Sequence, residues 1–205
     1  MKSLTAVQHQ RRERILLSTR DQLSEFGYEG LNMRELALIS DVSTSTLYNL
    51  YQSKDTLILA ALEDLLADIN AVVAETDTSG LGRFLARVNA VAEQIVDTPR
   101  YAEAVGKMLF SADAQDPIVR LLIGTSLSFN SEELAEMAVC GELREETDRK
   151  FLARSLSSIG WSTILMWMKG YVALHDFKQE YVRSAVTIML PHVTRSAEVR
   201  LRQQL

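Results

Sequence analysis

The sequence predicts an all-α fold, with an N-terminal three-helix helix-turn-helix domain and a C-terminal helical domain. Glycine and proline are scarce, at 9 and 3 of 205 residues, so long helices can form. Apolar residues recur at helical spacing along most of the chain, and no stretch shows the two-residue alternation of a half-buried strand. Hydrophobic residues make up 47% of the chain, which is enough to build a core.

The helix-turn-helix is predicted over residues 32–51, NMRELALISDVSTSTLYNLY. Asn32 is expected to cap the first helix, and Glu35 follows at the spacing of a capping box. The turn follows, and its Asp41 tolerates a positive φ better than most residues. Ser43 is expected to cap the second helix, and Leu47 and Leu50 are expected to pack inward.

The outer face of the second helix is predicted to be polar, with Thr44, Ser45, Thr46, Tyr48 and Asn49 exposed. In helix-turn-helix proteins the N-terminal residues of the second helix contact base edges in the major groove. The sequence therefore predicts double-stranded DNA as a partner.

This stretch and its flanks resemble the N-terminal domain of TetR-type transcriptional repressors. The residues that carry the resemblance are Arg14-Ile15-Leu16, Phe26-Gly27-Tyr28-Glu29, Asn32-Met33-Arg34-Glu35-Leu36-Ala37, Val42-Ser43, Thr46-Leu47-Tyr48, Tyr51, Ser53-Lys54 and Leu57. The resemblance implies a DNA-binding domain over residues 9–69, whose boundary lies inside a connecting helix. It also implies an effector-binding and dimerisation domain over residues 70–205.

Eight residues are predicted to contact DNA. Lys54 follows Ser53, a predicted helix cap, and an ammonium group at a helix N-terminus forms a good phosphate site. The resemblance likewise implies that Lys54 contacts the DNA backbone. The predicted set is Arg34, Ser43, Thr44, Ser45, Thr46, Tyr48, Asn49 and Lys54.

The predicted recognition helix carries no cation of its own, so phosphate affinity must come from elsewhere. Arg11, Arg12 and Arg14 open the first helix. Two interpretations stay open for them: contact with phosphate beside the major groove, or an ordinary solvated face. Tyr51 is expected to belong to the core, in contrast to Tyr48.

Helical spacing and cap signals predict the remaining elements. Residues 1–8 are expected to form a flexible arm, Gly27 a left-handed helix cap, and the residues after Pro191 a polar tail. Helices are expected over residues 9–26, 54–75, 81–97, 100–110, 116–139, 148–174 and 177–190.

The resemblance implies that the last two long helices pair with their copies in a homodimer. The helix over 148–174 has apolar residues nearly all round, so it must be covered on most sides. Two copies of the DNA-binding domain on a two-fold axis would read a pseudo-palindromic operator. The predicted interface residues are Leu156, Ile159, Ile164, Tyr181, Val182, Val186 and Met189.

The resemblance also implies a small, largely apolar effector, which shifts the helix over 54–75 and releases the repressor from DNA. Candidate pocket residues are Met108, Phe110, Phe129, Met137, Trp161, Met166 and Trp167. One alternative is a helix-turn-helix regulator without a small-molecule effector. Another is an all-helical lipid carrier or enzyme with a vestigial DNA-binding domain.

Charge and composition exclude several other classes. The net charge is −5, but residues 1–54 carry a net +1 and the rest carry −6, so the acidic bulk would repel DNA and orient the protein. The only cysteine, Cys140, suits a reducing compartment, and neither a signal sequence nor an apolar run of the roughly 20 residues that a membrane span needs is evident. A cytoplasmic protein is expected.

The three histidines, His9, His175 and His192, lie far apart in the sequence, and His175-Asp176 is expected in a loop. No phosphate-binding loop, dinucleotide motif or nucleophile elbow is present. The sequence therefore predicts no metal site, no cofactor and no catalytic activity.

Overall fold

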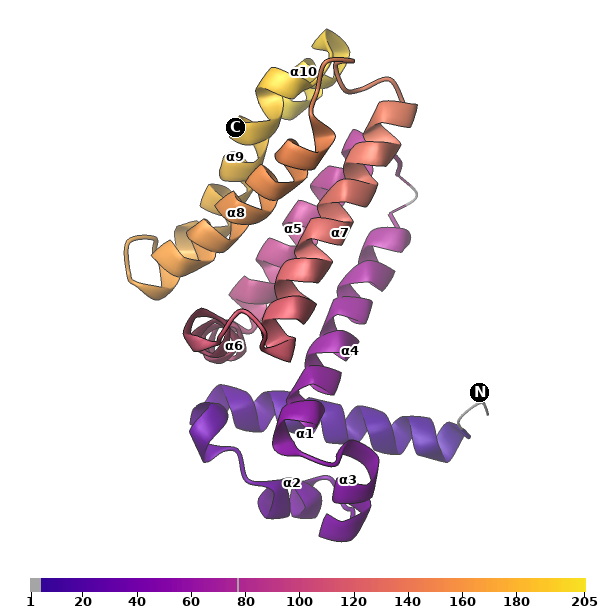
Figure 1. The fold of residues 1–205 in the computed structure, drawn as a ribbon, viewed down its shortest axis with the longest axis vertical. Coiled ribbons are helices and arrows are strands. Elements are labelled where there is room, and N and C mark those ends of the chain that lie inside the picture. Colours follow the sequence, from indigo (N-terminus) through magenta and orange to yellow (C-terminus); the bar gives the residue numbers. More distant parts are fainter. Residues whose placement is uncertain (1–4, 77) are drawn as a thin grey trace. The chain divides into compact units, whose positions relative to one another are not determined.

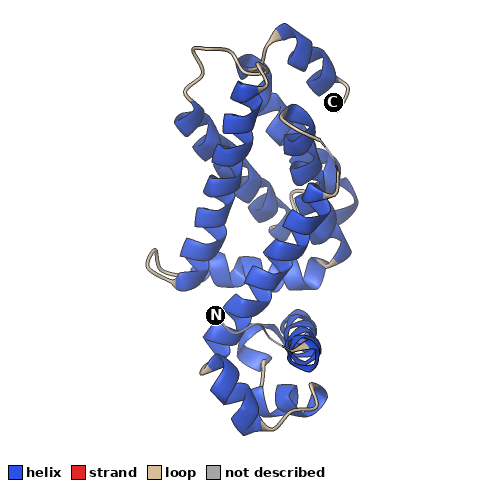
Figure 2. Cartoon of the chain, turned by 90° about the vertical axis from the view of Figure 1, so that its right-hand side faces the viewer, coloured by secondary structure: helices blue, strands red, loops and turns tan. Residues whose placement is uncertain are grey.

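The computed structural model describes residues 5–76 and 78–205, and these residues are almost entirely helical (Figures 1 and 2). The helices are α1 Ala6–Gly30, α2 Met33–Ile39, α3 Thr44–Tyr51, α4 Lys54–Ala74, α5 Leu81–Asp97, α6 Pro99–Ser111, α7 Pro117–Val139, α8 Arg149–Met168, α9 Leu174–Met189, the 3₁₀ turn η1 Leu190–His192 and α10 Arg195–Arg202. Within the described ranges, β-pairing is limited to one isolated bridge between Leu143 and Val193.

The chain divides into two compact units. Unit 1 comprises the described residues up to Ala67 together with Arg100–Ser111, and unit 2 comprises the rest. The division falls inside α4, close to the boundary after residue 69 that the sequence suggested. Most of α6 belongs to unit 1, which the sequence did not indicate.

Helix α1 begins earlier than predicted. Thr5 and Gln8 form a capping box, in which the Gln8 N–H donates to Thr5 Oγ1 and the Thr5 N–H donates to Gln8 Oε1 at 2.8 Å. Residues 6–8 are thus helical rather than part of an arm, and residues 1–4 lie outside the described residues. Gly27 has the predicted positive φ, 67°, but marks a kink after which a last turn runs to Gly30. Phe26, the last residue before this kink, is 49% exposed.

The helix-turn-helix forms as predicted in most respects. Asn32 caps α2 by accepting from the Arg34 N–H at 2.9 Å, and Ser43 caps α3 by accepting from the Thr46 N–H at 3.1 Å. Asp41 in the turn has φ 53°, which confirms the predicted positive value. The prediction for Leu50 is wrong, because its side chain is 52% exposed and α3 is held inward by the fully buried Leu47.

The core of unit 1 joins α1, α2, α3 and the N-terminal part of α4. Its buried residues are Ile15, Leu16, Met33, Leu36, Ala37, Leu47, Leu57 and Ala61. Val42, Ala60 and Tyr51 pack against this cluster, so the prediction that Tyr51 belongs to the core is confirmed.

Unit 2 is a helical bundle, in which α8 packs against α7 and α9, and α9 packs against α5. The main core cluster contains Leu81, Phe84, Leu134, Met137, Leu143, Leu152, Ala153, Leu156, Val182, Ala185, Val186, Met189, Val193, Ala197 and Leu201. A polar group is also buried there. Arg87 Nε donates to Glu133 Oε1 at 2.8 Å, Arg87 Nη1 donates to Asn70 Oδ1 at 2.6 Å, and the guanidinium stacks over the Phe129 ring.

Several boundaries in unit 2 differ from the prediction. Helix α8 ends at Met168, since Gly170 with φ 78° reverses the chain, and α9 begins at Leu174. His175 and Asp176 therefore lie in the first turn of α9 rather than in a loop. The expected polar tail contains helix α10, which is anchored by the buried Ala197 and Leu201.

None of the helices in the described ranges is long and apolar enough to cross a membrane.

Candidate nucleic-acid interface

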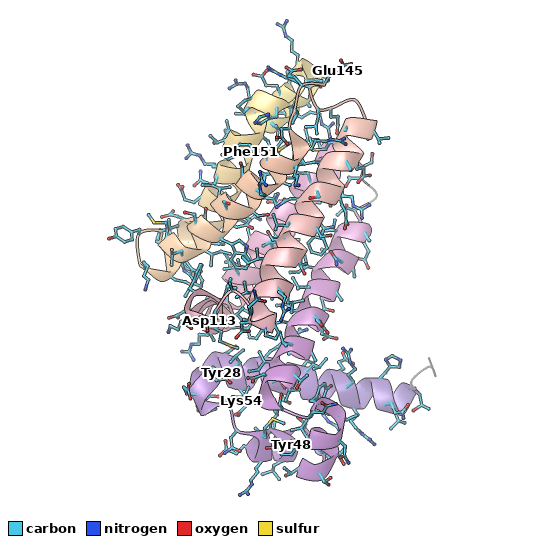
Figure 3. All side chains as sticks on the ribbon, in the orientation of Figure 1. Tyr28, Tyr48, Lys54, Asp113, Glu145 and Phe151 are labelled. Carbon is cyan, nitrogen blue, oxygen red and sulfur yellow. The ribbon has the colours of Figure 1, made fainter. Side chains whose placement is uncertain are left out.

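The exposed face of α3 is polar, as the sequence predicts. Ser45, Tyr48 and Asn49 are exposed, and Thr44 and Thr46 are half-buried. Tyr48 is 47% exposed, and Figure 3 labels its side chain on the helix-turn-helix. This face offers hydroxyl and amide groups, which can both donate and accept hydrogen bonds at base edges.

Ser43 differs from the others in this predicted set. Its hydroxyl oxygen caps α3, and it also lies 2.9 Å from Ser45 Oγ and 2.7 Å from Thr46 Oγ1. Ser43 therefore holds the start of the helix, and its hydroxyl has less freedom to bond with a base than those of its neighbours.

Lys54 lies at the start of α4, directly after the cap residue Ser53, which accepts from the Thr56 N–H at 3.1 Å. The Lys54 ammonium lies 4.3 Å from the centroid of the Tyr28 ring, and the two residues are labelled in Figure 3. The Tyr28 hydroxyl donates to Asp55 Oδ1 at 2.6 Å. Tyr28 was not among the residues predicted to act in DNA binding. The available cue was its place directly after Gly27, where the chain leaves the main helix.

The arginines at the start of α1 were predicted either to contact phosphate or to form a solvated face, and neither interpretation describes all of them. Arg12 pairs with Asp64 of α4 at 3.0 Å, and Arg20 pairs with the other oxygen of Asp64 at 2.8 Å. Arg14 Nε donates to the Ser40 carbonyl at 2.7 Å. Arg12 and Arg14 therefore tie α1 to the other helices of unit 1, and Arg11 and Arg14 are both exposed. Arg34, at the start of α2, is exposed as well.

Two tyrosines lie near this cluster of charges. Burial raises the pKa of Tyr51 above its ordinary value, against the opposing effect of the Arg12 charge, while the Asp64 carboxylate raises it slightly further. Burial likewise raises the pKa of Tyr101 on α6, with Arg20 again opposing and Asp64 reinforcing the shift. Both phenols stay neutral at physiological pH, so the charge of this part of unit 1 is set by its arginines and carboxylates.

Unit 2 contains a small cavity of about 40 Å³. It is lined by Phe84, Val88, Ser126, Asn130, Leu156, Ile159, Gly160, Tyr181 and Ala185. All of these side chains are uncharged. Two of the polar lining residues share a partner, because Ser126 Oγ and Asn130 Nδ2 both donate to Ser157 Oγ, at 3.1 and 2.9 Å.

The candidate pocket residues from the sequence lie elsewhere. Met137 is fully buried in the core, and Phe129 lies under the Arg87 guanidinium. Trp161 and Trp167 pack in a separate cluster with Phe177, and Trp167 and Phe177 meet edge to face. Met166 and Phe110 are each 43% exposed, and Met108 is half-buried on α6 in unit 1.

Most of the predicted interface residues are also placed differently from expectation. Leu156, Ile164, Val182, Val186 and Met189 are buried within the chain itself, and Ile159 and Tyr181 line the cavity. Helices α5 and α7 of the same chain already pack against α9 and α8, so the burial of these side chains requires no partner subunit. The side chains of α8 that remain exposed include Phe151, Ser158, Ser162 and Met166.

Comparison with known proteins places the helix-turn-helix in a family. Residues 15–61 match the model of the bacterial regulatory proteins of the tetR family. The HTH-type transcriptional repressor KstR of Mycobacterium tuberculosis is 29% identical over 172 residues, which cover 78% of this chain and 72% of that protein. KstR of Mycolicibacterium smegmatis is 28% identical over 172 residues, 78% of each chain.

Solved structures share the whole fold. A TetR-family regulator from Rhodococcus superposes with a TM-score of 0.74 at 18% identity, covering 88% of this chain and 99% of the other. SmeT, the repressor of the Stenotrophomonas maltophilia multidrug efflux pump SmeDEF, superposes with a TM-score of 0.73 at 17% identity, covering 91% and 92%. The polar face of α3, the capped helices around it and these likenesses agree: residues 15–61 form a helix-turn-helix domain of the tetR family of bacterial regulatory proteins, and the chain has the fold of TetR-family regulators of solved structure.

Proposed function

We propose that the protein is a homodimeric repressor that binds a pseudo-palindromic operator and is released from it by a small, largely apolar effector. The observation that carries the proposal is the polar, exposed face of α3, with the cation Lys54 at the start of the next helix. The name of the KstR proteins, transcriptional repressors of similar sequence, supports repression rather than activation.

Within this proposal, the residues of α3 and its flanks divide into two groups. Thr44, Ser45, Thr46, Tyr48 and Asn49 contact base edges or adjacent phosphates, because they form the exposed polar face. Arg34 and Lys54 contact phosphates, and Ser43 acts mainly as the cap of α3. Replacing Thr44 or Asn49 changes which operator is preferred, whereas replacing Lys54 weakens binding to all sequences and flattens its salt dependence.

The dimer would use the outer face of α8, on which Phe151, Ser155, Ser158, Ser162 and Met166 form one stripe at helical spacing. Phe151 is 58% exposed and Met166 is 43% exposed, with serines between them. Small residues allow a second helix to approach closely, and the two apolar side chains supply area to bury. This stripe replaces the buried residues named from the sequence.

The effector would bind at the cavity of unit 2. Its walls combine five apolar side chains with Ser126, Asn130 and Tyr181, which suits a neutral ligand bearing one or two hydrogen-bonding groups. A volume of about 40 Å³ is far below that of drug-sized pockets, which are roughly 300–1,000 Å³. Binding of a larger effector therefore requires the surrounding helices to move apart. Such a movement is one way for the effector to change the conformation of the rest of the chain.

The proposal is tested by a gel shift with DNA fragments flanking the protein's own gene, against excess nonspecific DNA, at two salt concentrations. We expect a complex with two subunits and a dissociation constant of about 10⁻⁸ M or tighter. Weak, sequence-blind binding to every fragment, including those from a random-sequence selection, would instead support a vestigial DNA-binding domain.

The small cavity also favours one alternative, a repressor that responds to no small molecule. A screen of neutral apolar compounds for release of the operator separates the two. Gly160→Ala tests the cavity directly, because a methyl group there would come within 3.1 Å of the Tyr181 hydroxyl at the cavity wall. We expect it to reduce the effector response and leave operator affinity unchanged.

A further inference from the structure

Lys54 is held in an unusual way for a lysine near the protein surface. Its ammonium lies 4.3 Å from the centroid of the Tyr28 ring, within the range of a cation–π contact. The ring is itself fixed, because the Tyr28 hydroxyl donates to Asp55 Oδ1 at 2.6 Å, and Asp55 is the next residue of α4. Ring and ammonium are therefore both tied to the first turn of the same helix.

The other cations that tie α1 to its neighbours are held by oxygen atoms instead. Arg12 and Arg20 share the carboxylate of Asp64, and Arg14 bonds to the Ser40 carbonyl and lies 3.8 Å from the Asp41 carboxylate. Across residues 5–76 and 78–205, Lys54 makes no ion pair. An aromatic ring orients a cation without cancelling its charge, so Lys54 remains able to bind an anion.

Orientation matters for a lysine more than for most residues. Its four-carbon stem has many rotamers, and ordering such a side chain on binding costs free energy. A ring that already restricts the ammonium reduces this cost. The position is also suitable, because Lys54 lies at the N-terminal end of α4, where the helix dipole favours an anion.

We propose that Tyr28 is a positioning residue for DNA binding: its ring holds the Lys54 ammonium at the start of α4 in the orientation that contacts a backbone phosphate. This inference rests on the proposed function, since it requires that the protein binds DNA and that Lys54 touches a phosphate. Gly27 contributes by its φ of 67°, which turns the chain just before Tyr28.

A double-mutant cycle on DNA affinity tests the proposal with the full-length protein. Tyr28→Leu removes the ring, and Lys54→Met removes the charge while keeping the stem. Affinity is measured for the operator and for a nonspecific duplex over a series of salt concentrations. We expect Tyr28→Leu alone to weaken both by about two- to fivefold, which is the strength of an exposed cation–π contact. The double variant should match Lys54→Met alone.

Two matched variants separate the ring from its hydroxyl and from general effects. Tyr28→Phe keeps the ring and loses the hydroxyl that bonds to Asp55, so it should retain most of the affinity. Tyr171→Leu makes the same change as Tyr28→Leu at a residue that is 77% exposed in unit 2, and it should leave DNA binding unchanged.

Tyr28→Leu could disturb folding, so a second series keeps the shape of the side chain. Phenylalanine with increasing numbers of fluorine atoms at position 28 weakens the negative face of the ring in steps. Operator affinity should fall in the same order with Lys54 present and stay constant in the Lys54→Met background. An equal loss in both backgrounds, or additive effects in the cycle, overturns the inference.

The design also distinguishes failure of this inference from failure of the proposed function. If the wild-type protein binds no operator, the proposed function fails and the inference fails with it. If the wild type binds an operator and Lys54→Met binds it equally well, the proposed function stands, but the roles of Lys54 and Tyr28 in DNA binding are both overturned.

Discussion

Gly80, which precedes α5, is surrounded by side chains that leave no room for a larger residue. It has φ 54°, and a Cβ atom there would collide with the Glu142 carboxylate and lie 3.2 Å from Cys140 Sγ. Glu142 cannot move freely, because it accepts from the Leu81 N–H and pairs with Arg200 at 2.6 Å. These contacts join the start of α5, the end of α7 and α10.

Gly80→Ala should therefore lower the free energy of unfolding by about 2 kcal/mol or more, from the positive φ and the displaced carboxylate together. Urea unfolding followed by circular dichroism measures the change. Gly124→Ala is the matched control: Gly124 lies within α7 with no atom within 4 Å of the added methyl. We expect this control to be neutral or to stabilise by up to about 1 kcal/mol, and an equal loss in both variants would contradict the assignment.

Tyr181 gives the protein a predictable response to alkaline pH. Burial raises the pKa of Tyr181 to about 12, above the ordinary value of 10.0. The unfolded chain ionises this phenol at lower pH than the folded chain does. The contribution to stability is thus full below pH 10 and is lost as the pH rises from 10 towards 12.

The free energy of unfolding should accordingly fall more steeply above pH 10 in the wild type than in Tyr181→Phe. Part of the fall remains in the variant, because burial also raises the pKa of Tyr51 and Tyr101. Parallel curves for the two proteins would show that Tyr181 ionises equally easily when folded.

At the scale of single helices, cap residues in the sequence predicted where helices begin better than where they end. Asp116-Pro117 and Ser53 mark helix starts in the sequence, and the structure confirms both. Helix α8 was extended through residue 174, because apolar residues continue at helical spacing to Tyr171. Gly170 supplied the stop signal. Helix α10 was missed, since its two buried residues depend on contacts with distant segments that periodicity does not show.

Helix α4 is fixed in unit 1 by a polar clamp that could not be predicted from spacing. Asp64 accepts from Arg12 and Arg20, which lie two turns apart on α1, and Arg20 Nε also donates to the Ala61 carbonyl at 3.3 Å. The Asp64 side chain is only 25% exposed, so its charge is poorly solvated without these partners.

Asp64→Asn should lower the melting temperature of the protein and speed amide exchange in α1, with a loss of about 1–3 kcal/mol for hydrogen bonds to charged groups. The control is Glu63→Gln, which makes the same change of charge at the exposed neighbouring residue. If Glu63→Gln has the same effect, net charge rather than the clamp explains the loss.

For the whole chain, the sequence predicted those features that depend on contiguous residues. The helix-turn-helix motif, with its caps and the positive φ of Asp41, is encoded within about twenty residues. The cavity and the exposed face of α8 depend on which sides of α5, α7, α8 and α9 meet. Apolar residues lie on several sides of α8, so their spacing does not distinguish side chains that pack inside the chain from those that would contact a second subunit. This is why Leu156 and Val186 were assigned to an interface while Phe151 was not.

The dimer therefore provides the prediction that depends on the whole molecule. Phe151→Asp and Met166→Asp together place two charges on the exposed stripe of α8, and burying them against a second subunit would be costly. The double variant should be monomeric in sedimentation or light scattering and should lose operator affinity, because one subunit reads only half of a pseudo-palindrome.

Nonspecific binding should fall much less, since each subunit keeps Lys54 and Arg34. Val199→Asp, which introduces the same charge at a residue of α10 that is 59% exposed, is the control and should remain dimeric. A wild type that is monomeric at concentrations where it binds its operator would remove the dimer from the proposal. A double variant that stays dimeric would instead move the interface away from this face of α8.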